Sequence, residues 1–210
     1  GDWAGALKEA RQAQQITPNH LEASLLELQA RILMVSQASG PAAEREREWQ
    51  EIDTRLGQLD KTTGGNAQVR LLQAQAAMKR GKSAEAAQLL NGVEKERPTD
   101  VRVSVLQAEM LVEQGKLEEA IGVLRATVEQ FPQEIEPVRR LAVLFNRQKD
   151  QGQCESVIKQ AIARMERPEA RRDLGLLLAE LYHLWAREDA VRQWLTALAQ
   201  QFPNDIQIKR

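Results

Sequence analysis

The fold of this chain is decided by residues 71–98, LLQAQAAMKRGKSAEAAQLLNGVEKERP, and by residues 105–132, VLQAEMLVEQGKLEEAIGVLRATVEQFP. At an offset of 34 residues, the two stretches share small residues, leucines, a glycine and a closing proline. The matched positions are Gly81 and Gly115, Ala86 and Ala120, Leu90 and Leu124, and Pro98 and Pro132. A fixed period of this length is typical of a repeat protein in which each unit is one supersecondary motif.

Each unit is expected to form two helices, an A helix followed by a B helix. In the unit that ends at Pro132, Asp100 is a candidate N-cap because its side chain can accept from the free N–H groups of the first turn. Gly115 is expected to end the A helix, and Pro132 to end the B helix. Apolar residues recur at helical spacing: Val103, Leu106, Met110 and Leu111 in the A helix, and Leu117, Ala120, Ile121, Leu124 and Val128 in the B helix.

These positions resemble the tetratricopeptide repeat family, whose 34-residue unit has a small residue in helix A, a glycine at the turn, a small residue in helix B and a closing proline. The matching residues are Ala108, Gly115, Ala120 and Pro132, and again Ala74, Gly81, Ala86 and Pro98. The resemblance implies an all-α fold, a right-handed superhelical solenoid of antiparallel helix pairs with about eleven helices. It also implies a protein-binding role, with no catalytic residues of its own.

The same pattern divides the chain into seven segments. Departures from it include Lys149 at a turn-glycine position, Cys154 at a helix-B alanine position, and an insertion of about twelve residues, part of it at Gln37–Ala43. Both ends read as cut within a repeat, so a fragment of a longer array is expected, with atypical natural caps as the alternative. The segments are 1–18 (a second helix), 19–66 (a degenerate repeat), the repeats 67–100, 101–134, 135–168 and 169–203, and 204–210 (the start of a further helix).

Composition excludes several functional classes. The net charge is −1, from 29 basic and 30 acidic residues, which argues against a general nucleic-acid or membrane-surface binder. One cysteine and two histidines leave little material for a metal site or a cofactor, and no apolar run is long enough to insert into a membrane. Glu180 and His183 share a helical face but have no second half of a metal site, and Cys154 has no neighbouring histidine to activate it.

The partner-binding candidates are the A-helix residues on the face away from the packed alanine. A protein or peptide is the expected partner, in a concave groove of the kind that receives an extended peptide or a helix. The alternative is that these are ordinary solvated helix residues. The candidates are Gln68, Leu71, Gln75, Met78 and Lys79 in the repeat 67–100, Arg102, Val105, Glu109, Val112 and Glu113 in the repeat 101–134, and Glu136, Arg139, Val143, Asn146 and Arg147 in the repeat 135–168.

Two other functions stay open at this point: a structural spacer of a large cell-envelope or secretion protein, and an array that regulates an enzyme domain outside this sequence. The content of 20 Arg against 9 Lys suggests a bacterial source, and cytoplasm and periplasm are equally compatible with the sequence. Because truncation would expose apolar end faces, end-to-end self-association is also expected.

Overall fold

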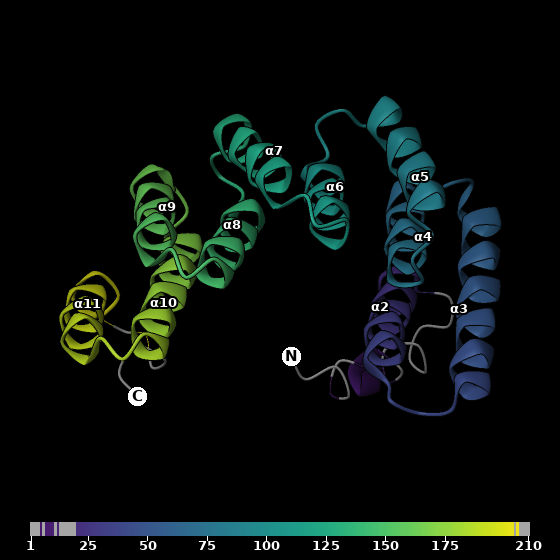
Figure 1. Cartoon of the computed structure of the whole chain (residues 1–210), viewed down its shortest axis with the longest axis horizontal. Coiled ribbons are helices and arrows are strands. Elements are labelled where there is room, and N and C mark those ends of the chain that lie inside the picture. Colours follow the sequence, from purple (N-terminus) through teal and green to yellow (C-terminus); the bar gives the residue numbers. More distant parts are fainter. Residues whose placement is uncertain (1–4, 6, 11, 13–19, 204, 206–210) are drawn as a thin grey trace. The chain divides into compact units, whose positions relative to one another are not determined.

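The computed structural model describes residues 5, 7–10, 12, 20–203 and 205, and throughout these residues the regular structure is helical. The expected segments 1–18 and 204–210 lie largely outside this part of the chain. Figure 1 shows the elements in order. They are α2 (Leu21–Gln37), α3 (Ala42–Thr63), α4 (Ala67–Lys79), α5 (Ser83–Glu96), α6 (Val101–Glu113), α7 (Leu117–Gln130), α8 (Ile135–Arg147), α9 (Gln151–Arg164), α10 (Pro168–Leu184) and α11 (Glu188–Gln201).

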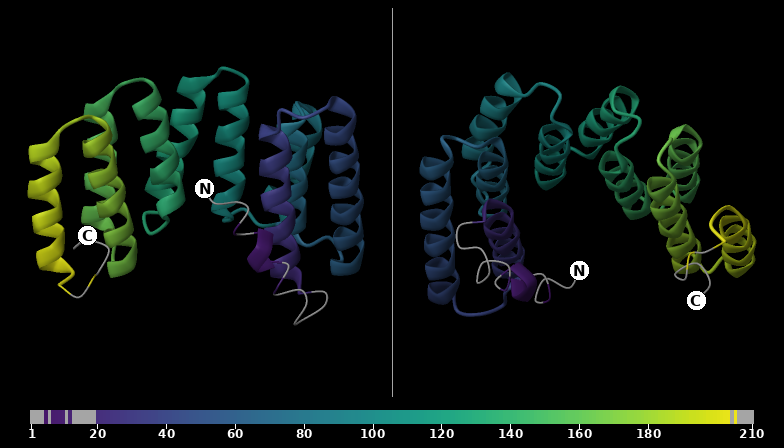
Figure 2. Two further views of the ribbon diagram at one scale, coloured as in Figure 1. Left: turned by 90° about the horizontal axis from the view of Figure 1, so that it is seen from below. Right: turned by 180° about the vertical axis from the view of Figure 1, so that it is seen from behind.

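The chain forms two compact units, Gly1–Leu106 and Gln107–Arg210, and the boundary between them falls within α6. Within each unit the helices are joined by short turns and lie antiparallel to their partners in sequence (Figure 2). In the N-terminal unit, α4 packs against α2, α3 and α5. In the C-terminal unit, α8 packs against α7 and α9, and α10 packs against α9 and α11.

Four of the turns within helix pairs have the same backbone geometry. At Gly81 and Gly115, φ is 74° and 77°, and the non-glycine residues Lys149 and Ala186 adopt the same left-handed region with φ of 60° and 56°. At the first of these turns, the N–H of Gly81 donates to the Met78 carbonyl at 2.8 Å. The next N–H, that of Lys82, reaches back five residues to a carbonyl of the preceding helix at 2.9 Å. This pair of bonds is the Schellman motif, which satisfies the last carbonyls of the A helix and reverses the chain.

One hydrophobic cluster of the N-terminal unit is formed by buried side chains of α2, α3 and α4. Leu28 and Ile32 of α2 meet Ile52 and Leu56 of α3, and all four side chains are at most 1% exposed. Val69 of α4 joins the same cluster. Because α3 buries only one narrow stripe in 22 residues, most of its surface is polar and faces solvent.

The C-terminal unit is held together by an apolar core and by one close helix contact. Leu124, Leu141, Ile158, Leu174 and Leu178 are at most 1% exposed and come from α7, α8, α9 and α10. The contact between α10 and α11 is made at Gly175, where an added Cβ would lie 2.7 Å from a terminal methyl carbon of Leu198. The indole N–H of Trp194 also donates to the Gly175 carbonyl at 2.8 Å, which links the two helices at this point.

Candidate partner-binding surfaces

The α4 candidates differ from one another in solvent exposure. Leu71 and Met78 are 5% and 2% exposed, so the expectation that these two side chains are accessible to a partner is wrong. The physical reason is that α4 is enclosed by α2, α3 and α5 and is buried on several of its faces. Gln68 is exposed, whereas Gln75 and Lys79 are half-buried.

The α6 candidates also differ from one another in solvent exposure. Val105 is 5% exposed, so the expectation that it is accessible to a partner is also wrong, while Val112 is half-buried. The Arg102 guanidinium pairs with the Asp100 carboxylate at 2.6 Å, and Asp100 also accepts from the Arg102 backbone N–H, as its assignment as an N-cap predicts. Glu109 is half-buried and Glu113 is exposed.

On α8, the candidates form an accessible face. Val143 is 46% exposed and Arg147 is exposed, whereas Glu136, Arg139 and Asn146 are half-buried. Arg140, which the sequence analysis did not select, pairs with Glu136 at 2.7 Å and with Glu109 at 2.9 Å. The exposed apolar side chain of Val143 therefore lies on a helix whose polar neighbours are held in place by ion pairs.

Two residues of α10 and its C-cap were missed by the sequence analysis. The indole N–H of Trp185 donates to the Asn146 side-chain oxygen at 2.7 Å, so Asn146 helps to join α8 to α10. Leu184, the residue before Trp185, is 66% exposed, the highest value among the large apolar side chains described as exposed. The periodicity of the repeat could have identified Leu184, because it lies two residues before the turn at Ala186, as Arg147 does before Lys149.

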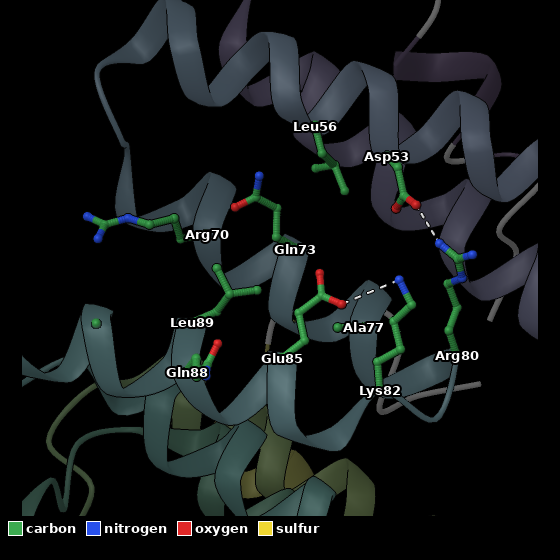
Figure 3. Close-up of a pocket in the computed structure, with 11 residues that line it drawn as sticks. Asp53, Leu56, Arg70, Gln73, Ala77, Arg80, Lys82, Glu85, Gln88 and Leu89 are labelled. Carbon is green, nitrogen blue, oxygen red and sulfur yellow. Dashed lines mark hydrogen bonds and ion pairs between the residues drawn. The ribbon is translucent and has the colours of Figure 1, made fainter.

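The N-terminal unit contains a pocket of about 510 Å³ with α4 as its floor and α3 and α5 as its walls (Figure 3). Asp53 of α3 points toward Arg80, and Lys82 points toward Glu85, as the dashed lines in Figure 3 mark. The Arg80 guanidinium also lies over the Trp49 ring, 5.6 Å from its centroid. These basic groups already have carboxylate partners within the protein, which weakens the pocket as an anion site.

A polar cluster links α9, α10 and α11 in the C-terminal unit. The Glu155 carboxylate accepts from Lys159 at 2.6 Å and from Arg187 at 2.8 Å, and it also contacts the Tyr182 hydroxyl. Burial alone would raise the pKa of Glu155, but these hydrogen bonds outweigh it and lower the pKa to about 2. The carboxylate is therefore ionised at neutral pH and has a structural role in joining three helices.

The nearby Cys154 is not a reactive thiol. Its side chain is 0% exposed, and its Sγ donates to the Ala142 carbonyl at 3.3 Å. Burial, followed by the negative charges of Asp150 and Glu155, raises the pKa of the thiol to about 11. A thiol in this environment stays protonated and packs as a small core residue.

Metal sites and membrane-spanning helices are the two remaining features that bear on function in the described part of the chain. No group of three or more His, Cys, Asp and Glu side chains is placed to hold a metal ion among these residues. Of the helices the structure describes, none combines the length and the apolar character that a membrane crossing requires.

Comparison with known proteins identifies the family. Residues 71–135, which run from α4 to the start of α8, match the family model for the tetratricopeptide repeat. Residues 71–135 of the chain are a tetratricopeptide repeat segment. This confirms the family expected from the glycine, alanine and proline positions, and it confirms an all-α, helix-pair solenoid as the fold class.

Solved structures of other tetratricopeptide and related helical proteins share this fold. A thermophilic tetratricopeptide repeat protein of Thermus thermophilus is 19% identical, with a TM-score of 0.51 over 87% of this chain and 95% of that chain. The human IFIT1 dimer with m7Gppp-AAAA is 14% identical, with a TM-score of 0.53 over 93% of this chain, which spans 45% of the IFIT1 chain. At these identities the likeness shows the fold alone. The comparison with curated protein sequences found no match.

Proposed function

We propose that this protein is a non-catalytic scaffold that binds a peptide or helix of a partner protein on the A-helix face of its C-terminal unit. Tetratricopeptide repeats are in general protein-interaction modules, and the chain carries that repeat at residues 71–135. The observation that carries the proposal is the exposure of Val143 and Leu184, at 46% and 66%, on two neighbouring A helices. Most other large apolar residues of α8 and α10 are buried or half-buried, so these two are available to a partner.

The surroundings of these two residues support binding by a preorganised surface. The hydrogen bond between Trp185 and Asn146 ties the end of α10 to α8, and Arg140 holds Glu136 on the same helix. A surface whose side chains are already held in place loses little conformational entropy when a partner binds. Polar groups around an apolar centre are also the usual arrangement at a protein interface.

The expected gain in affinity is modest. Covering roughly half of a valine and two thirds of a leucine is worth about 2 kcal/mol, which corresponds to about 30-fold in affinity. These two side chains therefore act as anchors of a larger contact, because the remaining affinity must come from main-chain and polar contacts along the peptide.

A selection experiment tests this proposal. A display library of random 12-residue peptides is selected on the immobilised chain, and each enriched peptide is titrated against the wild type, Val143→Glu and Leu184→Glu. Each variant is expected to weaken the peptides at least about tenfold, because a charge replaces an apolar anchor. Leu117→Glu is the matched control, since Leu117 is 36% exposed and lies on a B helix. Leu117→Glu should bind like the wild type.

Two results would overturn the proposal. Peptides that bind Val143→Glu and Leu184→Glu as tightly as the wild type would place the binding surface elsewhere. A selection that enriches no peptide would favour the alternatives, a structural spacer of a larger assembly or an array that regulates an enzyme domain outside this sequence.

A further inference from the structure

The C-terminal unit has a hollow on the side of α8 that lies opposite Val143. It has a volume of about 360 Å³ and lies between the B helices α7 and α9, and α8 forms its floor. We call it the α7–α9 groove. Leu141 and Phe145 of α8 line its floor, and Val128 of α7 and Val157 of α9 line its walls. A volume of this size is within the range of natural ligand pockets, which are about 300–1,000 Å³.

The α7–α9 groove is separate from the A-helix face proposed above. Leu141 and Phe145 each lie two residues from Val143 along α8. Because an α-helix turns by about 100° per residue, a separation of two residues places side chains on nearly opposite faces. The burial agrees, since Leu141 and Phe145 are at most 4% exposed whereas Val143 is 46% exposed.

The two ends of the groove differ in charge. At one end, the Arg125 guanidinium lies over the Phe145 ring, 5.4 Å from its centroid, and donates to the Gln153 side-chain oxygen at 3.2 Å. Both of these contacts are with neutral groups. At the other end, Arg164 pairs with the Glu129 carboxylate at 2.7 Å, so the charges there largely cancel.

The pocket between α3 and α5 in the N-terminal unit differs from the α7–α9 groove in the partners of its arginines. It also lies between two B helices above an A helix, but its Arg80 pairs with Asp53 and Glu46 and its Arg70 pairs with Glu96. In that pocket the protein itself supplies the carboxylates. In the α7–α9 groove, the place of a carboxylate next to Arg125 is taken by a neutral amide, which a ligand carboxylate can supplement.

The length of the groove sets the size of its ligand. The lining residues of α9 run from Gln153 to Arg164, and at 1.5 Å per residue this span is about 16 Å. An extended chain advances about 3.3 Å per residue, so about five residues fit along the groove.

We propose that the α7–α9 groove binds a short extended peptide segment that places a bulky apolar side chain between Val128 and Val157 and a carboxylate against Arg125. The half-buried valines of the two walls supply the non-directional part of the affinity. Arg125, held over the Phe145 ring, selects acidic segments over neutral ones and fixes the direction of the chain.

The proposal is tested with three labelled five-residue peptides. The first has phenylalanine at its centre with aspartate on both sides, the second replaces aspartate by asparagine, and the third replaces phenylalanine by alanine. Fluorescence anisotropy is measured with the full chain at up to about 1 mM, a concentration that detects weak peptide binding. The acidic phenylalanine peptide is expected to bind about fivefold more tightly than either of the others, the size of effect that one partly exposed ion pair supports.

Variants then assign the preference to residues. Arg125→Gln should abolish the preference for aspartate over asparagine, and Arg125→Lys, which keeps the charge, should retain most of it. Ser156→Trp, which places a large side chain in the lining of the groove, should weaken all three peptides. Met34→Glu, which changes an exposed apolar side chain of α2 outside the groove, should leave the affinities of all three peptides unchanged. Far-UV circular dichroism shows that each variant is folded.

Each outcome either supports or refutes peptide binding in the α7–α9 groove. The proposal fails if the acidic peptide does not bind at about 1 mM protein, if asparagine and aspartate peptides bind the wild type equally, or if Arg125→Gln keeps the preference. Loss of binding in Val143→Glu would instead assign the peptide to the A-helix face, which would support the proposed function and reject this groove.

Discussion

The turn between α10 and α11 contains a strained alanine whose replacement should stabilise the protein. Ala186 has φ of 56°, and its equivalents in two other repeats are Gly81 and Gly115, with φ of 74° and 77°. For an L-residue with a Cβ, the left-handed region costs about 1–2 kcal/mol. Ala186→Gly removes this cost but adds about 0.4–1 kcal/mol of chain entropy to the unfolded state. The net expectation is a gain of about 0.5–1 kcal/mol, or about 2 °C in Tm for a chain of this size.

Two controls isolate the backbone conformation as the cause. Ala197→Gly makes the same chemical change at an exposed position within α11 and should lower stability by about 1 kcal/mol. Gly81→Ala is the reverse change at an equivalent turn, where an added Cβ meets nothing within 4 Å, so only backbone strain is introduced. Gly81→Ala should lower the free energy of unfolding by about as much as Ala186→Gly raises it.

The assay is urea unfolding followed by far-UV circular dichroism, together with thermal melts at matched concentration. The slope of the urea transition should stay constant, because none of these substitutions changes the buried surface appreciably. If Ala186→Gly lowers the midpoint as Ala197→Gly does, the left-handed turn carries no strain that glycine relieves, and the reasoning is refuted.

Three further predictions concern the C-terminal unit. Glu155→Gln should destabilise the protein at pH 7 by about 1 kcal/mol. Because the pKa of Glu155 is lowered in the folded state to about 2, the stabilisation by its carboxylate is present above about pH 4.3 and is lost as the pH falls toward 2. The urea midpoints of the variant and the wild type should therefore converge in acid. Cys154 should not react with a thiol reagent at pH 8 in the native state, since its pKa is raised to about 11, and should release one thiol per chain in urea; rapid native labelling would contradict its burial. Gly175→Ala should cost about 1 kcal/mol despite the better helix propensity of alanine, because overpacking against Leu198 costs about 1–3 kcal/mol. Adding Leu198→Val should recover part of that loss in thermal melts, and an unchanged Tm for Gly175→Ala would show that the contact yields freely.

The candidate sites were only partly predictable, and the reasons can be stated for particular residues. The offset of 34 residues identified the A helices, and on α8 it selected Val143, which is exposed. The same rule applied to α4 selected Leu71 and Met78, which are buried because three neighbouring helices surround α4. Sequence spacing assigns a residue to a face of its helix, but it does not show which neighbouring helix covers that face.

Local features of the fold were therefore readable from the order of the residues. Glycine and proline restrict φ and hydrogen bonding within a few residues, so the 34-residue recurrence of Gly81 and Pro98 predicted helix pairs and their turns. Contacts between distant residues were not readable in this way. The bond from Trp185 to Asn146 and the position of Arg125 over Phe145 both depend on helices brought together by packing, which spacing along one chain does not encode.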